Sequence, residues 1–190
     1  MARIGLQSVD FDVAAQQIRS ARLRSELVTQ EIPAPERIAP RSIALAAGVA
    51  RGPQRGPSPE ATIDSHHGAG RLVLMHDPES AEEWGAPFRI VCFAQAPLEV
   101  EIGVDPFISD VAWSWLVDAL DSRGADYTYI SGTATKTLSS GFGTLEAQGD
   151  AAQIELRASW TPLGSDFSAH AEAWAELLCL LAGLPHREGE

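Results

Sequence analysis

The fold is decided by two neighbouring stretches, Ala151-Ala152-Gln153-Ile154-Glu155-Leu156-Arg157-Ala158-Ser159-Trp160 and the run HAEAWAELLCLL at residues 170–181. In the first stretch apolar and polar side chains alternate, which is typical of a strand with one buried face. In the second, apolar side chains recur at the spacing of one helical face. The core therefore lies in the C-terminal half, where residues 105–184 hold four of the five tryptophans.

The rest of the chain supplies further strands and two more helices. Apolar residues at helical spacing after Asp10 predict a first helix that runs to about Val28. Asp105 and Pro106 open a second helix, 105–122, and Ser165 or Ser168 caps the last one. Strands that follow one another along the chain favour hairpins, so we expect an α+β fold with three helices on one face of a mainly antiparallel sheet of about five strands. The predicted order is α-β-β-β-α-β-β-α, with strands at residues 43–49, 72–75, 88–93, 127–138 and 151–160.

Residues 1–190 are expected to form a single globular domain, because a chain of this length can bury one substantial core. Residues 51–69 are rich in glycine and proline and contain no apolar stripe, so they are expected to form a flexible loop within the domain. A short flexible tail is expected at 186–190.

The net charge of −12 restricts the classes of partner. Residues 1–56 carry eight arginines against five acidic side chains, whereas residues 57–190 carry six basic against twenty-one acidic side chains. Nucleic acids and anionic membranes are bound by positive surfaces, so we expect neither as a partner. A basic N-terminal part that folds onto an acidic body accounts for the asymmetry; an anion-binding patch on that part is the alternative.

The cysteines and histidines form no recognisable motif in the sequence. Cys92 and Cys179 each lie in an apolar run, where a cysteine usually behaves as a small buried hydrophobic residue. Unpaired cysteines, together with an N-terminus that lacks a signal pattern, indicate a cytoplasmic protein. Because no two histidines have the spacing of metal ligands, we expect no metal and no cofactor.

Five residues are candidates for ligand or partner binding. Trp113 and Trp115 are two apart on a helix, so their side chains point about 200° from each other, and only one of them can join the sheet-facing stripe. Arg157 is a lone cation on the polar face of its strand, and His170 lies on the apolar stripe of the last helix. With Trp160 these residues would line a pocket between the second helix and the sheet. Each also has a structural interpretation, as a core residue or, for Arg157, as a solvated cation.

Four segments of the chain resemble a known family. They are EIPAPERIAP at 31–40, GRLVLMHDP at 70–78, WSWL at 113–116 and ELRASWTP at 155–162. Together they look like an actinobacterial family of unknown function, and the resemblance covers most of the chain outside the loop at 51–69. It implies a bacterial cytoplasmic protein and brings no activity, cofactor or catalytic residue with it.

Two functional interpretations follow from these observations. The aromatic core, the acidic body and the lack of a catalytic set favour a non-enzymatic binding or adaptor domain for an unknown protein partner. The alternative is a small-molecule-binding protein or small enzyme that uses the pocket between helix 105–122 and the sheet, and the sequence does not decide whether the chain is an enzyme. Because helices on one face leave the other uncovered, we also expect a homodimer through a sheet face or through the second helix.

Overall fold

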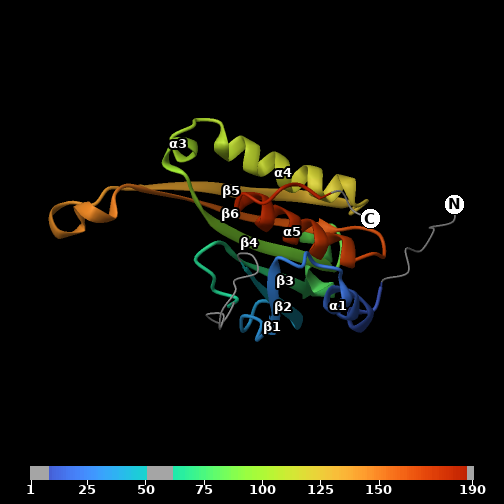
Figure 1. Ribbon diagram of the computed structural model, residues 1–190. Coiled ribbons are helices and arrows are strands. Elements are labelled where there is room, and N and C mark those ends of the chain that lie inside the picture. The colour runs from blue at the N-terminus through green and yellow to red at the C-terminus, as the bar shows by residue number, and fades with distance from the viewer. Residues whose placement is uncertain (1–8, 51–61, 188–190) are drawn as a thin grey trace, which may run out of the picture.

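The centre of the molecule is a six-stranded antiparallel sheet in the order β1-β2-β3-β4-β6-β5 (Figure 1). The computed structural model describes residues 9–50 and 62–187. The expected α+β single domain is confirmed. The strands are β1 (Leu27–Ile32), β2 (Arg41–Val49), β3 (Ala69–His76), β4 (Phe88–Leu98), β5 (Tyr127–Ser139) and β6 (Ala151–Pro162).

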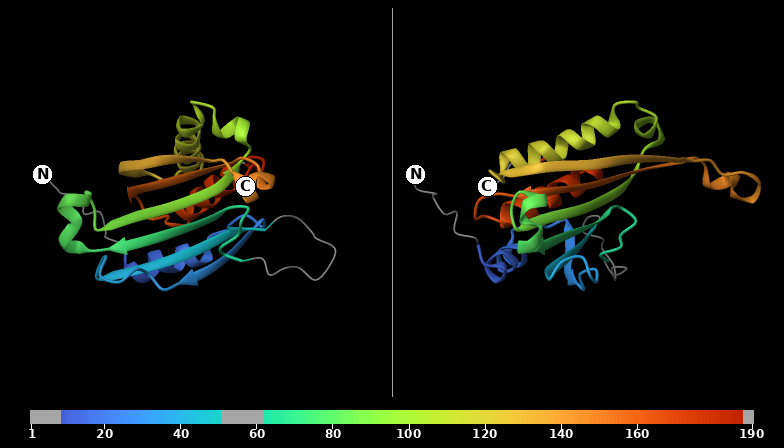
Figure 2. Two further views of the ribbon diagram at one scale, coloured as in Figure 1. Left: turned by 90° about the vertical axis from the view of Figure 1, so that its left-hand side faces the viewer. Right: turned by 180° about the vertical axis from the view of Figure 1, so that it is seen from behind.

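Three longer helices cover one face of the sheet: α1 (Phe11–Ser20), α4 (Ile108–Ser122) and α5 (Ser168–Leu181). α5 lies between the other two and packs across β2, β3 and β4, while α4 packs against β5 and β6 (Figure 2). Among the described helices, none is long and apolar enough to cross a membrane.

Alternate side chains of each central strand are buried beneath the helices. In β6 these include Ile154, Leu156 and Trp160, as the alternation predicts. Trp174 of α5 lies over Gly70 of β3, where an added Cβ would be 3.1 Å from the indole ring. Glycine therefore permits the close approach of helix and sheet at this point.

The first helix is shorter than the sequence predicts, and an additional strand follows it. α1 ends at Ser20 rather than near Val28, and β1 pairs antiparallel with β2. The β-branched residues Val28 and Thr29 favour an extended backbone. The edge of β2 offers this segment a ladder of hydrogen bonds, so pairing overrides the helical pattern that continues from α1. This strand accounts for the difference between the five expected strands and the six observed.

The ends of the later helices also differ in detail from the prediction. Asp105 accepts a hydrogen bond from a backbone amide at 2.8 Å, but α4 begins only at Ile108. The side chain that caps α5 is Asp166 rather than either predicted serine, and its Oδ1 accepts from the Ser168 amide at 3.1 Å. Gly183 ends α5 as expected, with a φ of 79°.

Short helical segments complete the connections. The 3₁₀ helix η1 (Pro78–Ser80) and α2 (Ala81–Trp84) join β3 to β4, and α3 (Val100–Gly103) precedes α4. A second 3₁₀ helix, η2 (Gly143–Gln148), forms the tip of the β5–β6 hairpin, which projects from the body of the molecule (Figure 1). Of the predicted flexible segments, 51–61 and 188–190 lie outside the described residues.

Candidate functional site

Two of the five candidate site residues lie deep in the core. Trp160 and His170 are fully buried, and the indole Nε1 donates to His170 Nδ1 at 3.0 Å. Burial lowers the pKa of His170 to about 4, so its imidazole is neutral near pH 7. The His170 Nε2 atom has no hydrogen-bond partner among the described residues. This pair joins β6 to α5 and has no exposed surface.

The other three candidates lie on two sides of the sheet. Trp113 and Trp115 are half-buried on α4, and both pack against the core. An added Cβ at Gly132 would be 2.6 Å from the Trp113 ring, which places this tryptophan against β5. Arg157 lies on the opposite face of the sheet, with its guanidinium carbon 5.4 Å from the centroid of the Phe93 ring. The structure thus does not bring the five residues together.

The face of the sheet opposite the helices is the open face, and most of its side chains on β4, β6 and β5 are exposed or half-buried. At its centre are Val91, which is 39% exposed, and the half-buried Phe93. Paired residues of neighbouring strands share a face, so the strand registers identify the surrounding polar residues. They are Arg71, Arg89, Gln95, Ser131, Thr133, Thr135, Thr137, Gln153, Glu155, Arg157 and Ser159.

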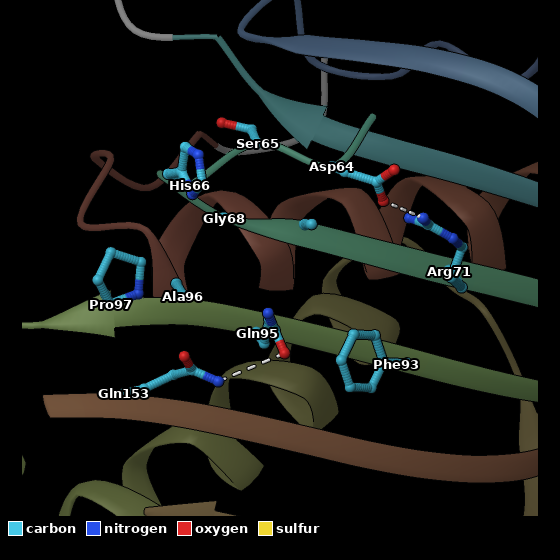
Figure 3. A pocket seen from close by; sticks show the side chains of 11 residues that line it. Asp64, Ser65, His66, Gly68, Arg71, Phe93, Gln95, Ala96, Pro97 and Gln153 are labelled. Atoms are coloured by element: carbon cyan, nitrogen blue, oxygen red, sulfur yellow. Dashed lines mark hydrogen bonds and ion pairs between the residues drawn. The ribbon is translucent and has the colours of Figure 1, made fainter. Parts of the chain in front are cut away.

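One end of the open face is hollowed where residues 62–66 lie against β2 and β3 (Figure 3). The hollow has a volume of about 340 Å³. Asp64 forms an ion pair with Arg71 at its upper rim, and Gln153 Nε2 donates to Gln95 Oε1 at 3.4 Å on its lower side. The hydroxyl of Ser65 donates to a backbone carbonyl at 2.6 Å and is not activated as a nucleophile. The hollow therefore offers polar contacts rather than a catalytic set.

A second hollow of about 490 Å³ lies at the other end of the sheet. Arg89 of β4 reaches toward β6, where its Nη1 donates to Thr161 Oγ1 at 3.0 Å and its Nη2 donates to Ser159 Oγ at 2.7 Å. Burial lowers the pKa of Arg89. The lining residues are Glu83, Trp84, Arg89, Tyr129, Ile130 and Ser131.

Tyr129 and Gly85 shape this second hollow. Tyr129 has a φ of 50°, in the left-handed region, and lies where the β5–β6 pairing shifts register between Thr128 and Ser131. Its ring rests on Gly85, because a Cβ added at Gly85 would clash with it. A β-bulge re-aims side chains in this way, and here it turns an aromatic ring toward the end of α2.

The two cysteines have a structural role, and the described residues form no metal site. Cys92 and Cys179 are buried free thiols, and burial raises the pKa of each to about 12. Within residues 9–50 and 62–187, no three His, Cys, Asp or Glu side chains gather in a group that could hold a metal ion.

Sequence reasoning did not single out Arg89. The available signal was a cation at an alternate position of the apolar strand Phe88-Arg89-Ile90-Val91-Cys92-Phe93. The bulge at Tyr129 could not be predicted from the sequence, because it depends on the register in which β5 pairs with β6.

Comparisons with known proteins place the chain in a family without assigning it an activity. No curated protein and no solved structure matches it. A family model does match, over residues 7–189, and its description is "protein of unknown function". The chain belongs to this family, DUF3000.

Proposed function

We propose that this protein is a non-enzymatic binding domain that receives an acidic segment of a partner protein on the open face of its sheet. The observation that carries the proposal is the uncovered apolar centre at Val91 and Phe93, which lies within a frame of hydroxyl, amide and arginine side chains. Exposed apolar surface rimmed by polar residues is typical of protein-binding sites.

The charge of the open face favours an acidic occupant. The chain as a whole carries −12, yet this face presents Arg89, which forms no ion pair with a described residue, beside Arg71 and Arg157, which are ion-paired with Asp64 and Glu155. Two copies placed face to face would add a second Arg89 to the shared surface, whereas an acidic segment would bring opposite charge to it. A second copy of the chain is therefore the less favourable occupant.

The edge of the sheet supports the binding of an extended segment. β5 forms this edge and pairs with β6 on one side only. It is 13 residues long, contains no proline, and is mostly exposed. A long exposed edge strand can accept a further strand through its free backbone groups.

The test compares two substitutions of equal chemistry at positions of equal exposure. Val91→Glu places a carboxylate at the centre of the open face, and Val111→Glu, at 38% exposure on α4, is the matched control. A photo-crosslinking residue at position 93 should form one discrete adduct in the source organism, whereas the same residue at Asp118 should not. The purified partner should then bind the wild type and the Val111 variant alike, and bind the Val91 variant at least about tenfold more weakly. Absence of an adduct at position 93, or equal binding of both variants, would refute the proposal.

The hollow in Figure 3 supports a second candidate function, the binding of a small polar molecule. Its lining includes the Asp64–Arg71 ion pair, His66 and the Gln95–Gln153 pair, which can bind either charge sign. Native mass spectrometry of the protein as purified tests this alternative. A bound small molecule that is lost in Arg71→Gln would support it, and a protein of unmodified mass would count against it.

The proposal includes an actinobacterial source and a cytoplasmic location. The segments that resemble the actinobacterial family support the source, and the two unpaired cysteines support a reducing compartment.

A further inference from the structure

The geometry points to a carboxylate-binding site at Arg89, in which the partner inserts a glutamate or aspartate side chain between Trp84 and Tyr129. This inference rests on the proposed function, since it names the group by which an acidic segment would be held at one end of the open face. The site is formed by β4, β5, β6 and the end of α2.

Among the described arginines, Arg89 differs from the others in being half-buried without an ion-paired carboxylate. Most described arginines are ion-paired, among them Arg71 with Asp64, Arg123 with Glu176 and Arg157 with Glu155. Arg22 and Arg37 form no ion pair within the described chain, but both are exposed to water. Arg89 is half-buried and bonds only to two hydroxyls among the described residues. It is thus a partly desolvated cation that forms no ion pair with any described residue.

The hydroxyls orient Arg89 and leave donors free. A guanidinium has five N–H donors, and two of them are used by Thr161 and Ser159. The Thr161 hydroxyl in turn donates to the carbonyl of Trp84 at 2.6 Å, which ties Arg89 to the end of α2. A guanidinium fixed in this way can bind a planar carboxylate through two parallel hydrogen bonds. The Ser131 hydroxyl also lines the hollow and can add a third.

The charge of the hollow favours a singly charged carboxylate over a phosphate. Among the described residues Arg89 is the one cation in the lining, and Glu83 contributes a negative charge to it. A phosphate group carries a charge of about −1.5 to −2 near pH 7, which one arginine beside a carboxylate does not balance. The side chains of Trp84 and Tyr129 line the hollow and can pack against the methylene groups of an inserted glutamate or aspartate.

The experiment is an NMR titration of the full-length protein with small probes. The probes are N-acetyl-glutamate N-methylamide, its glutamine analogue and inorganic phosphate. We expect saturable shifts of the Arg89 Nε–H and Trp84 Nε1–H resonances with the glutamate probe, and binding about tenfold weaker with the glutamine analogue and with phosphate. Arg89→Gln should abolish the saturable shifts. Arg22→Gln, which removes an exposed arginine that follows α1 and does not line the hollow, should leave them unchanged.

Two further variants keep the result interpretable. Arg89→Lys retains the charge but loses the planar set of N–H donors that binds a carboxylate through two hydrogen bonds. It should weaken binding of the glutamate probe about tenfold, and it provides a test even where Arg89→Gln fails to fold. Tyr129→Ala removes an exposed ring and should weaken binding of the glutamate probe as well. Tighter binding of phosphate, equal binding of the glutamine analogue, or no saturable shift at Arg89 would each overturn the inference. If the crosslink at position 93 still forms in that case, the proposed function stands and only the carboxylate site is lost.

Discussion

Glu176 lies in the middle of α5 with its side chain fully buried. Its Oε1 accepts from the Arg187 amide at 3.0 Å and lies 2.8 Å from His186 Nδ1, while its Oε2 faces Arg24 and Arg123 at 3.3 and 3.4 Å. Burial raises the pKa of Glu176, but these hydrogen bonds and charges outweigh burial and hold the pKa below its usual value. The residue thereby joins four separate parts of the chain around one charge.

Glu176→Gln should lower the free energy of unfolding by about 3–5 kcal/mol, because Arg123 would lose its buried counter-charge and Arg24 would keep only its ion pair with Glu26. Chemical denaturation at pH 7 measures this loss. Glu172→Gln, on the same helix, is the control; Glu172 accepts one backbone amide, so its loss should be about 1 kcal/mol. Since the folded-state pKa of Glu176 is depressed, its contribution is present above about pH 4.5 and disappears as the pH falls through the folded pKa. A constant difference between wild type and variant down to about pH 3 would contradict this account.

His170 should make the protein sensitive to mild acid. Its pKa is about 4 in the folded state against 6.5 ordinarily, so below pH 6.5 the unfolded chain takes up a proton that the folded chain excludes. Stability should therefore fall by about 2 kcal/mol between pH 6.5 and 5, at 1.4 kcal/mol per pH unit. Urea unfolding at the two pH values tests the slope, which should be smaller in His170→Gln. His67→Gln changes an exposed ring and should retain the wild-type slope.

At the scale of elements, the turn from α2 to β4 positions one wall of the Arg89 hollow. Gly85 follows α2 with a φ of 83° and supports the Tyr129 ring. A side chain at this position would be strained and would also displace the ring. The turn and the bulge in β5 therefore depend on each other, although 43 residues of sequence lie between them.

Gly85→Ala should lower the free energy of unfolding by about 2 kcal/mol and weaken the binding of the glutamate probe. Gly124→Ala is the matched control, since Gly124 also has a positive φ, of 62°, but has nothing within 4 Å of its added Cβ. Gly124→Ala should lower the free energy of unfolding by about 1 kcal/mol through backbone strain alone and leave binding of the glutamate probe unchanged. Thermal or chemical unfolding of both variants gives the comparison. Equal losses would show that Tyr129 does not rest on Gly85.

At the scale of the whole molecule, the helices leave one sheet face uncovered, and this was the basis for predicting a homodimer. The homodimer stays a prediction. The outward side of α4 carries Asp110, Asp118 and Asp121, and the open face carries Arg89, which forms no ion pair with a described residue. Either surface would oppose like charge across a two-fold axis.

We therefore expect a monomer at micromolar concentration and low salt, measured by light scattering. Raising the salt to about 0.5 M screens the repulsion and is the condition under which self-association should first occur. A dimer that is present at low salt and dissociates as salt is added would contradict the charge argument.

The sequence by itself determined the α+β class, five of the six strands, and a core centred on β6 and α5. Burial on one face of an element imposes a period of two or about 3.6 residues, and that period is visible in stretches such as Ile154 to Trp160. The end of α5 at Gly183 could be predicted for the same local reason, since a glycine there accepts the left-handed backbone of a helix end.

Only the tertiary structure decided β1, the bulge at Tyr129 and the surroundings of Arg89. Each depends on which strands become neighbours, and periodicity carries no information about that. Arg89 meets Thr161 and Ser159 at separations of 72 and 70 residues. The apolar positions of Trp160 and His170 are compatible with either a pocket wall or a buried pair in the core. The packing of α5 on β6, which periodicity does not predict, makes them a buried pair. A local pattern fixes whether a side chain is buried, while the contacts that give it a chemical role come from residues far away in the chain.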